Sequence, residues 1–422
     1  MLEFFIFILY IRIMKRLIFI LVIFLIGMTA FGQDLSFFAQ EYNRADATFA
    51  ERHLVLETLR DAGLTAPNLN EFYHSALRLL LSKSPDISST GERAIAERSI
   101  VILAEALGAA KYQEAAWDLW QAADLFDVFG NATDGNAQQA ALTALGQIGN
   151  KAVLPNLVLR LSEYNLQPVR NAEQRRRVNM AVIGFISALE AFKDISGFRP
   201  VFFASVGPYD QTIRSIAVAA LPNIVDDPSE AMIPMIREPG TDPATKLQIW
   251  RELNRTRMPN ASKARVAAAA IEVGWAIQTS NRTHQTALRE LRKGALEIIR
   301  QFGVSADSVY ADLERSYINN FENSNPDYDE IMLALNALTA VNTEQSVGLL
   351  YKFLNGINGR RRVGPWGNKE RRCFEWIVSC LGTTRTQMGE VRILLLTISR
   401  NTIYTPQERE MAARALSAIT GN

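Results

Sequence analysis

The hydrophobic positions between residues 140 and 161 form two successive helical patterns separated by a break. In "AALTALGQIGNKAVLPNLVLRL", apolar residues recur at intervals of three and four, stop at Gly149-Asn150-Lys151, and then resume. This spacing places the apolar side chains on one face of a helix, and glycine is a common helix terminator. The stretch predicts two helices joined by a short turn, with an apolar face that is buried only when a neighbouring pair stacks on it.

The same pattern recurs along the chain with a regular period. The stretch "ALTALGQIG" (141–149) matches "VAALPNIV" (218–225), "ALEIIRQFG" (295–303), "ALNALTAVN" (334–342) and "ARALSAITG" (413–421). The central apolar residues of the C-terminal half fall 39 residues apart: Ile299, Leu338, Ile377 and Leu416. Leu221 lies 78 residues before Ile299, which is two periods, and Leu145 lies 76 before Leu221. Self-similarity at this period is typical of repeat proteins made of helical hairpins.

This pattern resembles the HEAT and HEAT-like repeat families. The residues that match are the 140–161 stretch and, less closely, "IAVAALPNIVDDPSEAMIPMI" (216–236), and the resemblance extends over 94–422, weakly in 226–290. It implies an all-α fold, an α-solenoid of stacked hairpins. These families include transport receptors, scaffolds and a few enzymes, among them a metal-dependent hydroxylase with paired His-Glu dipeptides. Here Leu, Ser and Gln follow His53, His74 and His284, so that activity is not expected.

The pattern divides the chain into five segments. Residues 1–32 are a targeting segment, and 33–92 are an N-terminal helical cap that covers the first exposed repeat face. HEAT-like repeats follow in 93–236. In 237–290 the phase is broken, and "ATKLQIWRELN" (244–254) and "SKARVAAAAIEVGWAIQ" (262–278) look like one irregular hairpin that could form a bend or a pocket. Repeats with the 39-residue period occupy 291–422. No convincing period-two strand pattern is present.

The N-terminus has the three parts of a secretory signal peptide. Lys15 and Arg16 provide a basic start, "LIFILVIFLIGM" (17–28) is an apolar run, and Ala30 and Gly32 are small residues before a cleavage site at Gly32-Gln33. Met14 is a possible true start, because the apolar residues 1–13 precede the basic part. The alternative is an uncleaved membrane anchor, which would place Arg12, Lys15 and Arg16 in the hydrocarbon at high cost. We expect a bacterial periplasmic or secreted protein without a membrane span after cleavage.

Composition excludes some classes of function. Hydrophobic residues make up 48% and charged residues 21% of the 422 positions, which is ordinary for a folded protein. The formal net charge of +1 and the export signal argue against a nucleic-acid partner. The two cysteines, Cys373 and Cys380, are seven residues apart on one expected helix. Their Cα atoms would lie about 10 Å apart, too far for a disulfide.

No catalytic or metal-binding motif is present. The three histidines lie far apart and have no cysteine or acidic partner at metal-ligand spacing, so surface or capping roles are expected. Nucleophile-elbow, zinc-protease, phosphate-loop and dinucleotide motifs are all missing. The sequence therefore predicts no cofactor, no metal and no enzymatic activity.

The best functional candidate is "NGINGRRRVGPWGNKERR" (355–372), where six basic residues flank one tryptophan in a loop expected between helices. Arginine forks engage carboxylates or phosphates, and tryptophan is a common interface anchor. The alternative is a solvated loop whose arginines pair with acidic neighbours and whose tryptophan packs on the adjacent hairpin. The candidate partner-binding residues are Arg360, Arg361, Arg362, Trp366, Lys369, Arg371 and Arg372.

Two functions are consistent with these features. The first is a protein–protein interaction scaffold in the cell envelope, whose partner is another envelope protein. The second is an enzyme or binding protein for an anionic envelope polymer or peptide, which would use the irregular hairpin at 237–290 or the Arg/Trp loop. Two converging carboxylates in a deep pocket would favour an enzyme, and a smooth groove would favour the scaffold.

Overall fold

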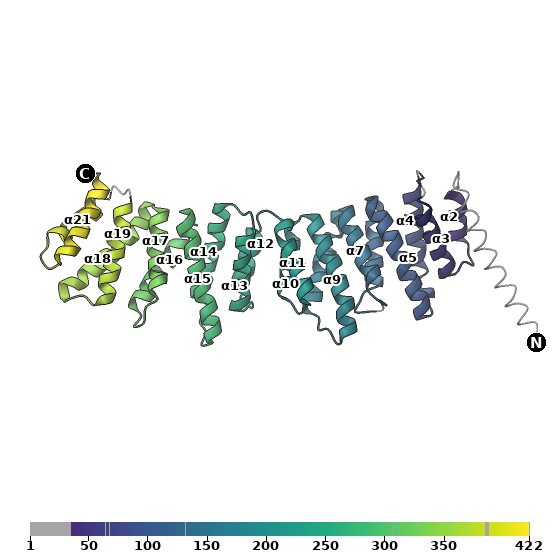
Figure 1. The fold of residues 1–422 in the computed structure, drawn as a ribbon, viewed down its shortest axis with the longest axis horizontal. Helices are drawn as coiled ribbons and strands as arrows, with labels where there is room; N and C mark the ends of the chain where they lie inside the picture. The colour runs from purple at the N-terminus through teal and green to yellow at the C-terminus, as the bar shows by residue number, and fades with distance from the viewer. Residues whose placement is uncertain are drawn as a thin grey trace, which may run out of the picture. The chain divides into compact units, whose positions relative to one another are not determined.

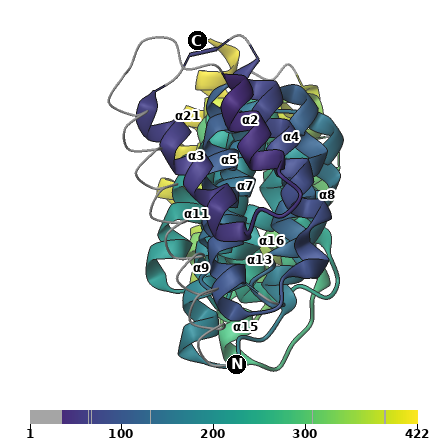
Figure 2. The same ribbon diagram turned by 90° about the vertical axis from the view of Figure 1, so that its right-hand side faces the viewer.

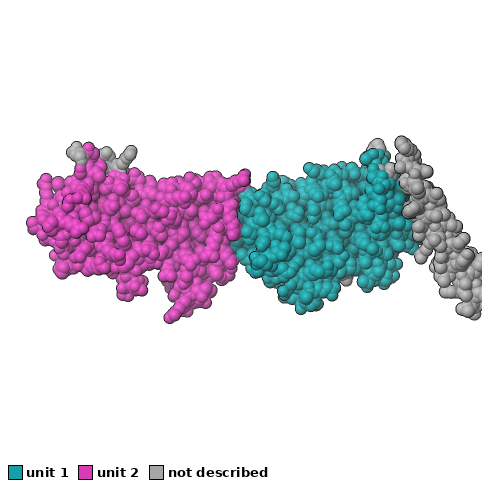
Figure 3. Space-filling view, in the orientation of Figure 1, with its two compact units in different colours: residues 1–225 teal, residues 226–422 magenta. Residues whose placement is uncertain are grey.

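The computed structural model of the chain describes residues 35–63, 65–66, 68–130, 132–306, 308–384 and 388–421. Throughout these residues the fold is all-α, with no strand (Figure 1). The chain divides into two compact units, one ending at Val225 and the other beginning at Asp226 (Figure 3). The signal peptide predicted in 1–32 lies outside the described residues.

Unit 1 consists of ten described helices. Their bounds are α2 Leu35–Asn43, α3 Phe49–Ala62, α4 Leu69–Ser82, α5 Thr90–Ala109, α6 Ala116–Leu125, α7 Asn136–Ile148, α8 Leu154–Leu166, α9 Ala172–Phe192, α10 Phe198–Val206 and α11 Gln211–Ile224. Helices α5, α7, α9 and α11 pack side by side in one row, while α4 packs on α6 and α8 on α10 in a second row. Helices α3 and α4 pack on α5, and Figure 2 shows them in front of it.

The break after Ile148 ends α7, as the sequence predicts. Gly149 has a left-handed backbone with φ of 72°, and its N–H donates a hydrogen bond to the Leu145 carbonyl. The Asn150 side chain then accepts a hydrogen bond of 3.1 Å from the N–H of Ala152. This cap starts a short 3-10 helix, η3 (Lys151–Val153), that leads into α8. Glycine fits here because a Cβ opposes the left-handed conformation.

Unit 2 has the same alternation of rows. Its helices are α12 Ser229–Arg237, α13 Pro243–Glu252, α14 Asn260–Ala276, α15 Arg282–Phe302, α16 Val309–Glu322, α17 Tyr328–Val341, α18 Glu344–Val363, α19 Asn368–Thr383, α20 Gly389–Arg400 and α21 Pro406–Thr420. Helices α13, α15, α17, α19 and α21 pack one on the next, and each of α14, α16, α18 and α20 packs on the helix that follows it.

The periodic apolar residues lie in the cores of the two units. Leu145 and Leu221 are buried in unit 1, and Ile299, Leu338 and Ile377 are fully buried in unit 2. Leu416 is only half-buried. It lies on α21, the last described helix, and no later helix packs on α21 in the described part of the chain.

The irregular segment 237–290 does not form one hairpin. Helix α13 packs on α12 and α15, whereas α14 packs on α12, α15 and α16. The two helices belong to different rows because the connection through η5 (Leu253–Arg255) and Met258-Pro259 carries the chain from one row to the other. Helix α13 has ten residues and α15 has twenty-one. This difference in helix length accounts for the break in the spacing of the apolar residues. None of the described helices combines the length and apolar character needed to cross a bilayer.

Candidate functional site

The Arg/Trp segment is mostly helical rather than a loop. Arg360, Arg361 and Arg362 lie in the last turn of α18, and α19 begins at Asn368. Only residues 364–367 connect the two helices. Glycine in a helix interior costs about 1 kcal/mol relative to alanine. Here the buried side chains of Phe353, Leu354 and Ile357 hold α18 together through its glycines.

Trp366 packs inside the fold. Its side chain is buried, and its indole N–H donates a hydrogen bond of 3.2 Å to the Ile357 carbonyl. The ring packs against Phe374, with ring centroids 4.8 Å apart, and against Tyr404, at 5.5 Å. Trp366 therefore joins α18, α19 and the chain before α21, and it presents little surface to a partner.

Most cations of the segment also have partners in the chain. Arg360 pairs with Glu322 and Glu370, Arg361 donates to the Ile403 carbonyl, and Lys369 donates to the Asn323 carbonyl. Arg371 lies 3.8 Å from Glu408, and Arg372 lies over the rings of Tyr328 and Trp376. Arg362 is exposed, with no hydrogen bond or ion pair to another described residue. The pairing of Arg360 and Arg371 with glutamates and the packing of Trp366 agree with the alternative interpretation, except that most of the segment is helix rather than a solvated loop.

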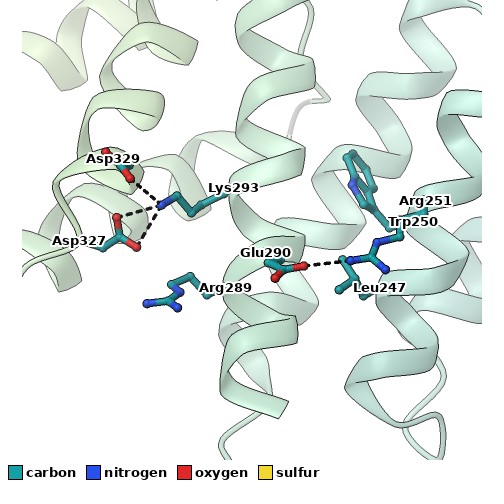
Figure 4. Close-up of a pocket in the computed structure, with 8 residues that line it drawn as sticks. All are labelled: Leu247, Trp250, Arg251, Arg289, Glu290, Lys293, Asp327 and Asp329. Atoms are coloured by element: carbon teal, nitrogen blue, oxygen red, sulfur yellow. Dashed lines mark hydrogen bonds and ion pairs between the residues drawn. The ribbon is translucent and has the colours of Figure 1, made fainter. Parts of the chain in front are cut away.

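A first pocket lies beside the predicted phase break, against α15. We call it the Lys293 pocket; it has a volume of about 660 Å³ (Figure 4). Its lining residues are Leu247, Trp250, Arg251, Arg289, Glu290, Lys293, Asp327 and Asp329.

Ion pairs neutralise most charges of the Lys293 pocket. Arg251 pairs with Glu290 at 3.1 Å, and the Lys293 ammonium contacts Asp327 at 3.1 Å and Asp329 at 3.2 Å. Burial lowers the pKa of Lys293, but its hydrogen bonds to the two aspartates outweigh this effect and raise the pKa overall. Figure 4 shows Arg289 between these two pairs without a bond to either.

A second pocket adjoins the first at Arg289, which lines both. This Trp275 pocket has a volume of about 720 Å³ and lies among the C-terminal end of α14, α15, α16 and the start of α17. The indole N–H of Trp275 donates to the Ser316 hydroxyl at 2.9 Å. The Arg292 guanidinium lies over the indole ring at 3.9 Å from the centroid, and that of Arg315 lies at 5.7 Å.

Arg292 is fully engaged in a buried ion pair. It donates two hydrogen bonds to the Glu330 carboxylate, at 2.7 and 3.1 Å, and a third to the Gly274 carbonyl at 2.9 Å. The Glu330 side chain is 0% exposed and that of Arg292 13%. This parallel two-bond geometry is the strongest form of arginine–carboxylate contact. Arg292 therefore supports the pocket and covers one face of Trp275, and its guanidinium is not open to a ligand.

The other arginines of the Trp275 pocket are open to a ligand. Arg282, Arg289 and Arg315 are exposed and make no ion pair or side-chain hydrogen bond with the residues that the structure describes. Side-chain amides surround them, from Gln278, Gln285, Asn319, Asn320, Asn323 and Asn325. The pocket's carboxylates, Asp327 and Glu330, are already held by Lys293 and Arg292. The open charged groups are thus all cationic, and the neutral amides around them can also donate, which suits an anionic ligand.

The sequence pattern did not predict the residues of this pocket, although it predicted a bend or a pocket in a segment that supplies part of it. Arg282 and Arg289 lie on α15, while Arg315 lies on α16. No local motif connects them, because the row packing of α14–α17 brings them together. The signal that was available is the phase break at 237–290, which predicts a bend or a pocket.

Two histidines and both cysteines pack inside the fold. His53 is buried and its ring lies 3.1 Å from the Ser99 hydroxyl, and His74 lies 2.6 Å from Asp118. The surface role expected for His53 is therefore wrong, because it packs between α3 and α5. Both cysteines are buried and free, and burial raises the pKa of the Cys373 thiol to about 12. Within the described ranges, no group of three or more His, Cys, Asp or Glu side chains could hold a metal ion.

No protein-family model matches the chain, and no curated protein matches it.

Proposed function

We propose that this protein is an exported interaction scaffold, an α-solenoid of HEAT-like repeats, that binds an acidic segment of another envelope protein. The 39-residue pattern and the rows of packed helices in each unit support the repeat architecture. The basic and apolar parts of residues 15–28 and the small residues before Gln33 support export. In this proposal the mature chain has no membrane span and no nucleic-acid partner.

One observation carries the binding function. Three arginines without ion pairs, Arg282, Arg289 and Arg315, line one amide-rich pocket of unit 2. Exposed arginines elsewhere in this unit, such as Arg237 and Arg265, pair with glutamates of neighbouring helices at 2.6 and 2.7 Å. The three arginines at the Trp275 pocket instead lie close together and leave fork-shaped donors for carboxylates supplied by a partner.

An acidic peptide fits this pocket better than an anionic glycan. Sugars bind proteins in part by stacking on open aromatic faces, but Arg292 covers a face of Trp275 at 3.9 Å. The surrounding amides can instead pair with the N–H and C=O groups of a peptide main chain. Binding is also favoured over catalysis, because Asp327 and Glu330 are held in ion pairs and neither is placed as a free general base.

The test replaces the three open arginines together. We expect the Arg282→Gln, Arg289→Gln, Arg315→Gln variant to lose at least tenfold in affinity for a fluorescein-labelled glutamate-rich decapeptide, measured by fluorescence anisotropy. In crosslinking on whole cells, the same variant should lose its envelope partner. The peptide in which glutamine replaces glutamate should bind neither protein.

A control variant has the same change in net charge. Arg237→Gln, Arg265→Gln and Arg300→Gln remove three exposed arginines that pair with glutamates outside the Trp275 pocket. This variant should bind the acidic peptide as the wild type does. Equal binding by the wild type and the open-arginine variant, with unchanged circular dichroism, would contradict the proposal.

A further inference from the structure

A separate groove lies in unit 1 and shares no residue with the Trp275 pocket. It crosses α3, α5 and α7 and has a volume of about 790 Å³. Its walls are polar side chains from all three helices, and small residues, including Ala140 and Ala144, lie among them. Helix α7 packs closely on α5 at Gly108, where an added Cβ would lie 2.9 Å from the Ala144 Cα atom.

Helix α7 lines this groove with a row of neutral polar side chains. Gln139, Thr143 and Gln147 are spaced four residues apart, which places them on one helix face. None of the three side chains makes a hydrogen bond with another residue in the described part of unit 1. We call this groove, defined by these three residues, the amide groove. The row is about 12 Å long at 1.5 Å per residue, the length of roughly four residues of extended chain at about 3.3 Å each.

This arrangement matches the main chain of an extended polypeptide. Each glutamine amide offers both a donor and an acceptor, and threonine offers a hydroxyl that does either. An extended chain presents N–H and C=O groups along its edges that need such partners. Recognition of this kind depends on the main chain for affinity and on a few side chains for specificity.

The charges of the amide groove favour a cationic side chain in that polypeptide. Four carboxylates line the groove against two arginines. Glu97 is buried and accepts hydrogen bonds from Thr133, and Glu57 is partly exposed with its carboxylate 3.4 Å from the His53 ring, whereas Glu105 is exposed. Glu57 lies on α3 and Glu105 on α5, so both carboxylates belong to helices other than α7 that line the groove. A lysine or arginine of the ligand would find them within the same groove.

We propose that the amide groove binds an extended segment of a partner protein through its main chain, and that this segment carries a lysine or arginine. The proposal is independent of the acidic ligand of the Trp275 pocket, because the two sites lie in different units and take ligands of opposite charge. The scaffold then has two recognition sites with different specificities.

The experiment selects peptides on the full-length exported chain. A displayed library of random nonapeptides is enriched on the wild type and then tested on the Gln139→Ala, Thr143→Val, Gln147→Ala variant. Selected peptides should contain lysine or arginine and should bind this variant at least tenfold more weakly. The control is the variant Gln121→Ala, Thr212→Val, which removes two exposed side chains of the same kinds from α6 and α11 and should bind as the wild type does.

A chemical variant of the peptide tests the role of its main chain. N-methylation at successive residues of a selected peptide removes main-chain donors and should weaken binding at least tenfold at one or more positions. The proposal is overturned if no peptide is enriched, if the triple variant binds as the wild type does, or if N-methylation has no effect at any position. Enrichment only of acidic peptides that depend on Arg282, Arg289 and Arg315 would also overturn it, while supporting the function proposed for the Trp275 pocket.

Discussion

The Arg292–Glu330 pair is the most deeply buried ion pair among the described residues, and it gives a sharp prediction about stability. Removing one partner of a buried pair leaves an uncompensated charge, which costs about 3–5 kcal/mol. We therefore expect Arg292→Met to lower the free energy of unfolding by that amount in urea denaturation. The double variant Arg292→Met, Glu330→Met should recover most of the loss, because two apolar side chains often replace such a pair without penalty. A double variant as unstable as the single one would contradict this account.

Asp327 gives a prediction about pH. Burial raises its pKa, but hydrogen bonds from the Glu330 N–H and the Lys293 ammonium outweigh burial, so the pKa lies below its usual value. A lowered folded-state pKa stabilises the fold above the unfolded-state value of about 3.9. This stability is lost as the pH falls through the folded-state pKa. Asp327→Asn should thus lower Tm at pH 6, and the difference from the wild type should shrink below about pH 4.

A neighbouring aspartate provides the control for this titration. Asp329 contacts the same ammonium but its side chain is 76% exposed, so its pair with Lys293 contributes little. Asp329→Asn should change Tm less than Asp327→Asn at pH 6. Equal effects of the two variants would show that burial does not govern the contribution of Asp327.

At the scale of single residues, the sequence predicted packing better than exposure. Cys380 lies three residues after the periodic Ile377, on the apolar face that the pattern predicts, and it is buried. The segment around Trp366 was expected to be a loop, because its glycines and Pro365 oppose helix. The outcome depends on contacts that the local sequence does not contain, such as the Trp366 ring against Tyr404 and the Arg371 contact with Glu408. Such contacts join residues about forty positions apart, so local propensity could not reveal them.

At the scale of helices, two glycines test the packing of the rows: one lies against a neighbouring helix and the other has open space beside it. In α7, an added Cβ on Gly146 would lie 2.7 Å from the Ala188 Cα atom of α9. Overpacking of this kind costs about 1–3 kcal/mol, so Gly146→Ala should destabilise the protein. In α18, nothing lies within 4 Å of a Cβ on Gly348. Gly348→Ala should stabilise by about 0.5–1 kcal/mol through helix propensity alone. Opposite shifts of the urea midpoint are the expected result.

Helix boundaries were the most predictable feature of the fold. Asn342 and Thr343 follow a periodic apolar run, and both residue types favour helix ends. Asn342 has a left-handed backbone after α17, with φ of 48°, and Thr343 caps α18 through a hydrogen bond from the Ser346 N–H. The pairing of helices was less predictable. Apolar periodicity identifies the buried face of α14. It does not show that α12, α15 and α16 cover this face, because that depends on how α13 and η5 place the start of α14.

At the scale of the whole molecule, the first prediction concerns export. If residues 1–32 are a cleaved signal, the protein recovered from the cell envelope should begin at Gln33, and mass spectrometry of its N-terminal peptide should show this. An intact N-terminus in the membrane fraction would support the anchor instead. An intact chain in the cytosolic fraction would contradict export.

In unit 2, ion pairs connect neighbouring helices of the same row at nearly constant sequence separation. Arg251 and Glu290 are 39 residues apart, Arg292 and Glu330 are 38 apart, and Lys352 pairs with Glu314 across 38. Each separation is close to the 39-residue period of the apolar pattern, so each pair joins helices about one period apart. Unlike the buried Arg292–Glu330 pair, the more exposed Arg251–Glu290 and Lys352–Glu314 pairs contribute little stability. The two residues that form the ion pair differ from one pair of helices to the next.

This difference affects which helices can pack on one another during folding. Leu338 and Ile377 are nearly interchangeable, so a nascent α15 could settle against α19 in place of α17 with little loss of apolar contact. In that mispaired state, the position of Glu330 would be taken by Lys369, which lies 39 residues later. Arg292 would then be buried against a like charge, and the trapped arrangement would be strongly disfavoured. We therefore expect the buried Arg292–Glu330 pair to disfavour this mispairing during folding, which the uniform hydrophobic pattern alone would allow.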